Sequence, residues 1–394
     1  MKNRLIKKST LWVLIIILIT AAIITGFLAV NNKYDEKTLL YPIQVDGKWG
    51  YINKTGKIVV EPTYAWADDF HDGVAIVLLN SNSDGNKDSR EDDSLKYGAI
   101  DTTGKMVVEP DYSSITKFNE GVAGAVIVDE ITYDLTYFIL DRKGKILYTL
   151  PPERQIVSML FNGTGLQTQS EGLILVQDDP TEMYGYIDRY GEIIIPYQYH
   201  EAYSFSDGLA LVKNDKHYQY IDKSGQVVID ASKYISGKSF SEGLAAVAVQ
   251  NKETSTVEYG YIDTKGNMKI EPKFTRAYRF SEGLAKVCVG ESINEYSIGY
   301  IDESGAYKIS PTLNDSYDET LISEGLVPIA DGAGGYMNKE GKLSIAPVVT
   351  KVEDNYLKYN MAGQFRNGIA KVSLSDGRIG YIDTTGKYIW DPRK

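Results

Sequence analysis

The stretch Gly260-Tyr261-Ile262-Asp263-Thr264-Lys265-Gly266 decides the fold, because close or looser copies of it recur along the chain. In each copy an Asp or Asn is followed three residues later by a glycine, and the nine glycines are Gly56, Gly104, Gly144, Gly191, Gly225, Gly266, Gly305, Gly341 and Gly386. Asp or Asn at the first turn position can accept hydrogen bonds from the backbone that follows, and glycine tolerates a positive φ. Since β-forming residues flank the motif, each copy predicts a β-hairpin.

Two further signatures accompany the hairpins. A proline follows the Asp or Asn after about nine residues, and because proline cannot donate to a ladder it is predicted to end the second strand. These prolines are Pro62, Pro110, Pro196, Pro272, Pro311, Pro347 and Pro392. The other signature is Phe-x-Glu/Asp-Gly-Leu/Val-Ala, as in Phe280 to Ala285, where the glycine marks a bend and the apolar run predicts a third strand.

The repeating unit is therefore predicted to be a three-stranded antiparallel meander, and nine units fit between residues 41 and 392. In Gly-Tyr-Ile-Asp the Tyr and Ile point to opposite faces, so both faces are apolar and each sheet must be covered on both sides. This all-β pattern predicts a stacked array, either an open curved solenoid or a propeller. The open form is favoured, because nine units exceed the usual range of about 4–8 blades and no strand is left over to close a ring.

The N-terminal segment has a different character. Residues 11–30 form an apolar run long enough to cross a bilayer as one helix. Basic residues precede this run, which predicts a cytoplasmic tail at 1–10, a linker at 31–40 and a repeat ectodomain at 41–394 outside the cytoplasm. A cleaved signal peptide and a buried core helix are the alternatives, but the run is long for a signal peptide and ends in a poor cleavage site.

The composition excludes several classes of function. The net charge is −11, and because residues 1–30 carry four basic and no acidic side chains, the rest carries −15, which disfavours nucleic acid. One cysteine, Cys288, and three histidines leave no material for a disulfide framework, and we expect no metal or cofactor site. The loop Asp84–Asp88 resembles the start of a calcium loop, but Ser89 and Leu95 stand where that loop needs Gly and Glu.

No catalytic motif is found either, and no Gly-x-Ser-x-Gly sequence occurs. The acids that recur before glycine or proline in successive units could form a glycosidase pair. Acids repeated in this way are better explained as turn formers or as acceptors for backbone N–H groups.

Lys48-Trp49-Gly50-Tyr51-Ile52-Asn53, followed by Gly56-Lys57, resembles the WG repeat of bacterial proteins, also called the KWG repeat. The resemblance covers residues 41–392, although only the first copy keeps Trp-Gly. At the Trp position other copies have Tyr97, Tyr184, Tyr259, Ile298, Gly334 or Ile379. The resemblance implies a β-repeat fold in a surface or secreted protein, and it implies no defined biochemical activity.

Aromatic residues outside the repeated Tyr position are the candidate ligand surface, since rings along one edge of the array could stack on sugars or anchor a peptide. They are Trp66, Tyr203, Tyr278, Tyr317 and Tyr356, and packing is the alternative role for each. The sequence thus predicts a cell-surface binding or scaffold protein whose ligand is a protein or a cell-wall glycan. A surface glycan hydrolase and a sensor ectodomain that acts through a partner are the alternatives.

Overall fold

The computed structural model describes residues 39–79, 96–157, 169–292, 295–313, 321–329, 335–346, 350–352, 355–357, 359–374 and 377–393. These residues belong to one compact unit, Leu39–Lys394. The apolar segment 11–30 and the loop Asp84–Asp88 lie outside them, so the predicted transmembrane helix stays a prediction. Within the described part of the chain, no helix has the length and apolar character needed to span a membrane.

The described residues form nine antiparallel sheets of three to five strands, which we number as blades 1 to 9, and one two-stranded sheet. Blade 1 consists of β1 (Tyr41–Val45), β2 (Lys48–Ile52) and β3 (Ile58–Tyr64). Blade 2 consists of β4 (Trp66–Ala67), β5 (Val74–Leu78), β6 (Tyr97–Asp101) and β7 (Met106–Tyr112). Blade 3 consists of β8 (Ser114–Ile115), β9 (Val122–Val128), β10 (Leu135–Asp141) and β11 (Ile146–Thr149).

Blade 4 has five strands, because two short segments pair with the same strand. They are β12 (Arg154–Ile156) and β13 (Gln169–Ser170), followed by β14 (Leu173–Asp178), β15 (Met183–Ile187) and β16 (Ile193–Tyr199). Blade 5 consists of β17 (Glu201–Ala202), β18 (Ala210–Lys213), β19 (Tyr218–Ile221) and β20 (Val227–Asp230). Blade 6 consists of β21 (Ser236–Gly237), β22 (Leu244–Gln250), β23 (Val257–Asp263) and β24 (Met268–Phe274).

The last three blades follow the same order. Blade 7 consists of β25 (Arg276–Ser281), β26 (Leu284–Ser292), β27 (Glu295–Asp302) and β28 (Tyr307–Leu313). Blade 8 consists of β29 (Leu326–Pro328), β30 (Tyr336–Asn338) and β31 (Leu343–Ile345), and the two-stranded sheet of β32 (Thr350–Val352) and β33 (Asn355–Leu357) comes next. Blade 9 consists of β34 (Tyr359–Arg366), β35 (Ile369–Leu374), β36 (Ile379–Asp383) and β37 (Tyr388–Trp390).

The Asp-x-x-Gly hairpins are confirmed. In blade 2 the Oδ1 atom of Asp101 accepts hydrogen bonds from the N–H groups of Thr103 (2.8 Å) and Lys105 (3.1 Å), and Gly104 has a φ of +85°. The Asp or Asn of each other copy accepts the same two bonds. The side chain therefore holds both ends of the turn, as the sequence predicts.

The prediction that proline ends the second strand is wrong for five of the seven prolines, while Pro392 follows the end of β37 and Pro347 lies outside the described residues. Prolines lie inside β3, β7, β16, β24 and β28, because the strand bulges at this point. In blade 6, Tyr259 pairs with Phe274 and Tyr261 with Ile270, so Gly260 alone faces three residues of β24. A Cβ atom on Gly260 would lie 2.4 Å from the Ile270 carbonyl oxygen and 2.8 Å from the Pro272 nitrogen. The bulge thus explains why the repeat needs its first glycine.

The three-stranded unit also needs correction, since the crossing segment supplies a fourth strand on the inner side of most blades. These strands are β4, β8, β17, β21, β25 and β34. A two-residue turn joins each to the next strand. In blade 6, Ser241 and Leu244 exchange backbone hydrogen bonds of 2.9 and 3.2 Å around Glu242 (φ +55°) and Gly243 (φ +79°). Two consecutive positive φ values are typical of the type I′ turn that suits a twisted hairpin.

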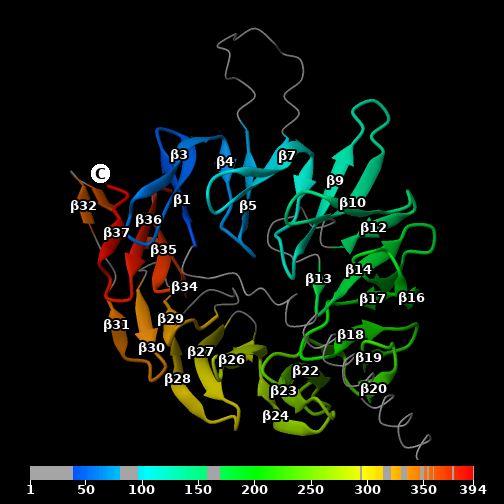
Figure 1. Ribbon diagram of the computed structural model, residues 1–394. Coiled ribbons are helices and arrows are strands. Elements are labelled where there is room, and N and C mark those ends of the chain that lie inside the picture. Colours follow the sequence, from blue (N-terminus) through cyan, green and yellow to red (C-terminus); the bar gives the residue numbers. More distant parts are fainter. Residues whose placement is uncertain are drawn as a thin grey trace, which may run out of the picture. The chain divides into compact units, whose positions relative to one another are not determined.

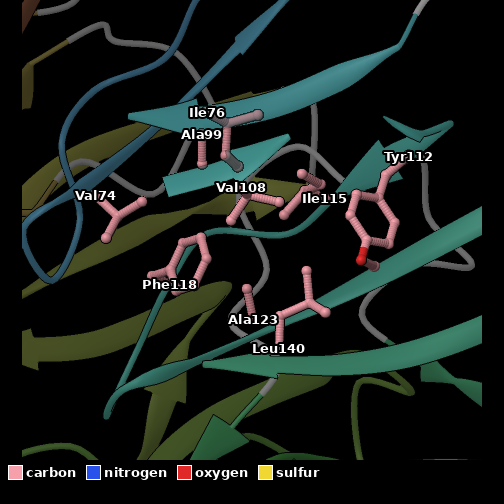
Figure 2. Close-up of a cluster of buried hydrophobic side chains, with 10 residues drawn as sticks. Val74, Ile76, Ala99, Val108, Tyr112, Ile115, Phe118, Ala123 and Leu140 are labelled. Carbon is pink, nitrogen blue, oxygen red and sulfur yellow. The ribbon is translucent and has the colours of Figure 1, made fainter. Parts of the chain in front are cut away.

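Hydrophobic cores lie between the blades, as the two apolar faces predict. Nine clusters of buried side chains occupy the nine boundaries, including the boundary between blade 9 and blade 1. Figure 2 shows the cluster between blades 2 and 3, where Ile76 and Val108 meet Ile115, Phe118 and Leu140. Every blade is therefore covered on both faces by its neighbours.

The array closes into a nine-bladed propeller, so the predicted open solenoid is wrong. Figure 1 shows the blades around a ring, with β20, β24 and β28 outward of β18, β22 and β26. At the closing boundary the Tyr381 and Tyr41 rings lie 5.4 Å apart, and the Tyr381 hydroxyl donates to the Pro42 carbonyl at 2.8 Å. Closure needs no shared strand, because side-chain packing between the first and last blades replaces it.

Candidate functional site

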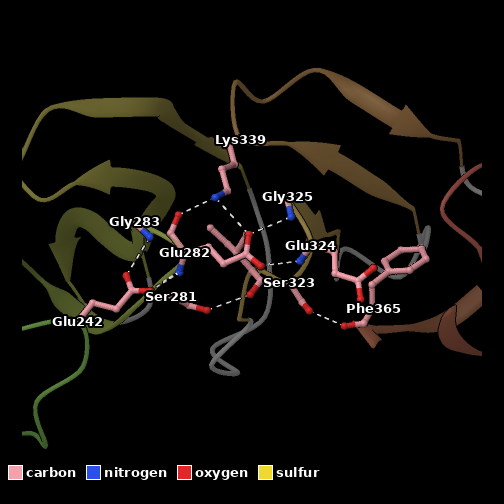
Figure 3. A network of polar contacts seen from close by, with 10 residues as sticks. Glu242, Ser281, Glu282, Gly283, Ser323, Glu324, Gly325, Lys339 and Phe365 are labelled. Carbon is pink, nitrogen blue, oxygen red and sulfur yellow. Dashed lines mark hydrogen bonds and ion pairs between the residues drawn. The ribbon is translucent and has the colours of Figure 1, made fainter. Parts of the chain in front are cut away.

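A network of acids and backbone N–H groups joins the bends of successive blades. The carboxylate of Glu242 accepts hydrogen bonds from the N–H groups of Glu282 (2.7 Å) and Gly283 (2.8 Å). The carboxylate of Glu282 accepts the equivalent bonds from Glu324 (2.6 Å) and Gly325 (2.9 Å), as Figure 3 shows. Each acid thus reaches forward from its own bend to the bend of the next blade.

We call this network the turn ladder. It contains the carboxylates Asp72, Glu120, Glu171, Asp207, Glu242, Glu282 and Glu324, each bonded to the next bend. Burial favours the neutral acid at Glu282, but the Gly325 N–H and the Lys339 ammonium hold the pKa of Glu282 below its ordinary value. Seven equivalent acids that all accept the glycine N–H of the next bend are a structural device, and their predicted role as backbone acceptors is confirmed.

Three of the five predicted surface aromatics have described side chains, and they lie in different blades. Trp66 in β4 is partly buried and packs edge-on against Tyr97, with ring centroids 6.1 Å apart. Tyr278 in β25 is only 6% exposed and belongs to the core between blades 7 and 8. Tyr203, which follows β17, is 44% exposed. Tyr317 lies outside the described residues, and of Tyr356 only the backbone in β33 is described.

A charged row crosses blade 5 beside Tyr203. Glu201 pairs with Lys213 across β17 and β18, and Lys213 pairs with Tyr218 across β18 and β19. The Lys213 ammonium lies 2.6 Å from Glu201 Oε1, and the Tyr218 hydroxyl donates to Glu201 Oε2 at 2.8 Å. Tyr203 follows β17, and its N–H donates to the Leu211 carbonyl at 3.0 Å, so the pairing continues and the side chains of Tyr203 and Glu201 share one face of the sheet. We call Glu201, Lys213 and Tyr218 the blade-5 row.

The electrostatics of the row follow from these contacts. The hydrogen bond from Lys213 lowers the pKa of Glu201, although partial burial acts in the opposite direction. Burial and the neighbouring Glu201 carboxylate raise the pKa of Tyr218 to about 12. Burial and the same carboxylate raise the pKa values of Tyr203 and of Tyr184 from blade 4. At neutral pH Glu201 is therefore a carboxylate and Tyr218 a protonated phenol.

The same row has a different composition in other blades. The equivalent residues are Trp66, Leu78 and Tyr97 in blade 2, Ser114, Val126 and Tyr137 in blade 3, and Ser236, Ala248 and Tyr259 in blade 6. None of these nine residues is charged, whereas blade 7 has Arg276 at the position of Glu201, followed by Cys288 and Ile298. Uncharged residues at these positions thus suffice to build a blade. The fold therefore does not require the acid–base pair of blade 5.

Sequence reasoning identified Tyr203 but missed the blade-5 row. Its three members lie on three strands, and only the strand register brings them together. A comparison of equivalent positions between repeats would have found Glu201, because no other described inner strand has an acid at this position.

Metal binding finds no support among the side chains that the structure describes, since they contain no group of three or more His, Cys, Asp or Glu residues suited to an ion. Cys288 is 1% exposed within the core between blades 7 and 8.

Comparisons with known proteins agree with the repeat. Five segments, residues 49–82, 97–127, 184–218, 220–252 and 259–291, match the family described as "WG containing repeat". No curated protein matches the chain in sequence.

Solved structures resemble the chain only weakly. A structure titled as the eukaryotic initiation factor has 10% identity and a TM-score of 0.38 over 70% of this chain and 85% of its own. The β-propeller domain of the Trilobed protease from Pyrococcus furiosus has 11% identity and a TM-score of 0.34 over 70% of this chain and 94% of its own. Likeness at this level carries no argument about function.

Proposed function

Because the chain is a WG-repeat protein that folds as a ring of nine blades, we propose that it is a binding or scaffold protein held on the outer side of the cell membrane. Its ligand is a protein or a cell-wall glycan. The observation that carries this proposal is the blade-5 row, where an acid–base pair, a tyrosine hydroxyl and the exposed Tyr203 lie together on one blade.

The fold supports binding more than catalysis. The repeated acids of the turn ladder are occupied by backbone N–H groups, so their carboxylates are committed to joining blades. The Glu201 carboxylate instead lies on a partly exposed surface, where its side chain and that of Lys213 are 39% and 34% exposed. Polar groups that a rigid scaffold presents at the surface are suited to recognition.

The membrane location rests on the sequence of residues 1–30, with its basic start and its apolar run. We expect the full chain to sediment with membranes and to resist extraction by alkaline carbonate. We also expect protease added to intact cells stripped of their wall to digest the repeats. A mature N-terminus near residue 30, or repeats protected until the cells are lysed, would overturn this part of the proposal.

Retention of ligands tests the binding function directly. The full chain, immobilised in detergent, is incubated with purified cell-wall fragments and with solubilised surface proteins. We expect one of the two fractions to be retained, and the retained material to be released by excess free fraction. Retention of neither fraction would contradict the proposal, and release of shortened glycan fragments would favour the hydrolase alternative.

A further inference from the structure

We propose that the blade-5 row and Tyr203 form a subsite for a neutral sugar residue. This inference rests on the proposed binding function and names the ligand class of one site. Four side chains carry it: the carboxylate of Glu201, the ammonium of Lys213, the hydroxyl of Tyr218 and the exposed ring of Tyr203.

The row has hydrogen-bonding capacity left over for a ligand. A carboxylate offers about four lone-pair sites, and Glu201 uses one on each oxygen, for Lys213 and for Tyr218. An ammonium has three donors, and Lys213 directs one of them to Glu201. Acceptors and donors therefore stand side by side at a surface where both side chains are partly exposed. Adjacent sugar hydroxyls, which donate and accept in turn, match such a pair.

The ring of Tyr203 supplies the other half of sugar recognition. Sugars combine a face of C–H groups with an edge of hydroxyls, and an aromatic ring offers an apolar face for the former. Tyr203 is 44% exposed and lies on the same sheet face as Glu201.

The charge balance selects a neutral ligand. The charges of the Glu201 carboxylate and the Lys213 ammonium cancel each other. Beyond residue 30 the chain carries a net charge of −15, which repels an anionic polymer. A neutral glycan is not repelled in this way.

The site is also built before any ligand arrives. Glu201, Lys213 and Tyr218 are direct neighbours on three hydrogen-bonded strands, so their backbone positions are fixed by the sheet. Lys213 and Tyr218 each donate to a different oxygen of the Glu201 carboxylate, and these two bonds limit the rotamers of the Glu201 side chain. Such preorganisation reduces the entropy lost when a ligand binds.

The experiment titrates the full chain, kept in a detergent without a sugar headgroup, with cellotetraose and chitotetraose and with polygalacturonate as an anionic polymer. Binding is measured by calorimetry and by saturation-transfer NMR. We expect one neutral oligosaccharide to bind and polygalacturonate not to bind. We expect Tyr203→Ala and Glu201→Gln each to weaken binding about tenfold, and Tyr203→Phe, which keeps the ring, to stay within about twofold.

Tyr190→Ala is the matched control. Tyr190 is 65% exposed and lies in the hairpin between β15 and β16 of blade 4, outside the proposed subsite. It should leave binding unchanged, and thermal unfolding of every variant checks that the ring is intact. If cell-wall material or a surface protein is retained while both neutral oligosaccharides fail to bind, the sugar subsite is overturned and the binding function stands. If an oligosaccharide binds equally to Tyr203→Ala and Glu201→Gln, its site lies elsewhere and this assignment is wrong. If nothing binds in either experiment, both proposals fail.

Discussion

At the scale of single residues, the acids of the turn ladder have an unusual setting for exposed side chains. Glu242 is exposed, yet both of its carboxylate oxygens accept backbone N–H groups from the next blade. Hydrogen bonds to a charged acceptor are stronger than neutral ones. The charge of the acid, and not only its shape, therefore joins the blades.

We expect Glu242→Gln to destabilise the protein by about 1–2 kcal/mol, because the amide group turns an –NH₂ donor toward one of the two N–H donors. The measurement is the midpoint of urea unfolding. The matched control is Glu271→Gln at an exposed position of β24, which should change stability by less than about 0.5 kcal/mol. Equal midpoints for the two variants would show that the ladder contributes nothing.

Individual residue roles were predictable where the partner lies close in sequence. The Asp-x-x-Gly turn is such a case, because the side chain of Asp101 bonds groups only two and four residues away. The first glycine of the motif was not understood, since its partner, the Pro272 bulge opposite Gly260, follows it by twelve residues on another strand. The sequence alone gave no sign of how closely the two backbones approach.

At the scale of elements, the hairpins make part of the stability depend on pH, because folding lowers the pKa of the turn Asp in five of the nine hairpins. The hydrogen bond from the Ser304 hydroxyl comes first among the contacts that hold the pKa of Asp302 far below its ordinary value, and it outweighs partial burial. A carboxyl whose pKa is lowered by folding stabilises the protein above the pKa of the unfolded chain, about 3.9 for Asp. That contribution disappears as the pH falls through the folded value.

Asn is the natural test at this position, because blades 1 and 8 already use Asn53 and Asn338. We expect Asp302→Asn to keep the turn, to lower the melting temperature by a few degrees at pH 7, and to approach the parent as the pH falls from about 4 to about 2. Thermal unfolding at three pH values measures the difference in melting temperature between Asp302→Asn and the parent. Asp111→Asn, at an exposed position of β7, is the control. A difference in melting temperature that stays constant with pH would show that the ionisation of Asp302 does not contribute to stability.

The inner strands show why some elements could not be predicted. β4, β8, β17 and β21 have only two residues each, too few to show an alternating pattern. They exist because a type I′ turn folds them back onto a longer strand, as around Glu242 and Gly243. The blade-5 row was missed for the same reason, since Glu201 belongs to such a strand.

At the scale of the whole molecule, ring closure depends on one boundary that no covalent connection crosses. The Tyr381 and Tyr41 rings and the hydrogen bond from Tyr381 to Pro42 hold blade 9 against blade 1. At five other boundaries the same Tyr packs against a Phe of the next blade, as Tyr261 does against Phe280. Tyr41 therefore replaces the missing Phe at the point of closure.

We expect Tyr381→Ala and Tyr261→Ala each to remove about 3–5 kcal/mol of packing. Only Tyr381→Ala should let the ring open, because the chain itself still links the blades on either side of Tyr261. Small-angle scattering at a temperature where both variants remain folded should show a larger radius of gyration for Tyr381→Ala alone. Equal radii would mean that closure rests on other contacts.

Closure itself was beyond sequence reasoning. The stacking of blades on both faces was predicted from the apolar Tyr and Ile of the repeat, and the nine clusters confirm it. Whether nine such contacts add up to a full circle depends on the small rotation at each boundary. No single residue encodes that sum, and the absence of a shared strand pointed in the wrong direction.

The forward reach of every ladder acid has a consequence for how such a chain evolves. The junctions between blades 2 and 9 are alike, since each presents an Asp or a Glu to the glycine of the next bend, so removal or duplication of one inner repeat would recreate a compatible junction. The two ends are not interchangeable, because Tyr41 stands in blade 1 and Asn367 takes the place of the acid in blade 9. A change in the number of inner repeats would thus preserve the ladder, whereas the first and last blades must fit each other for the ring to close.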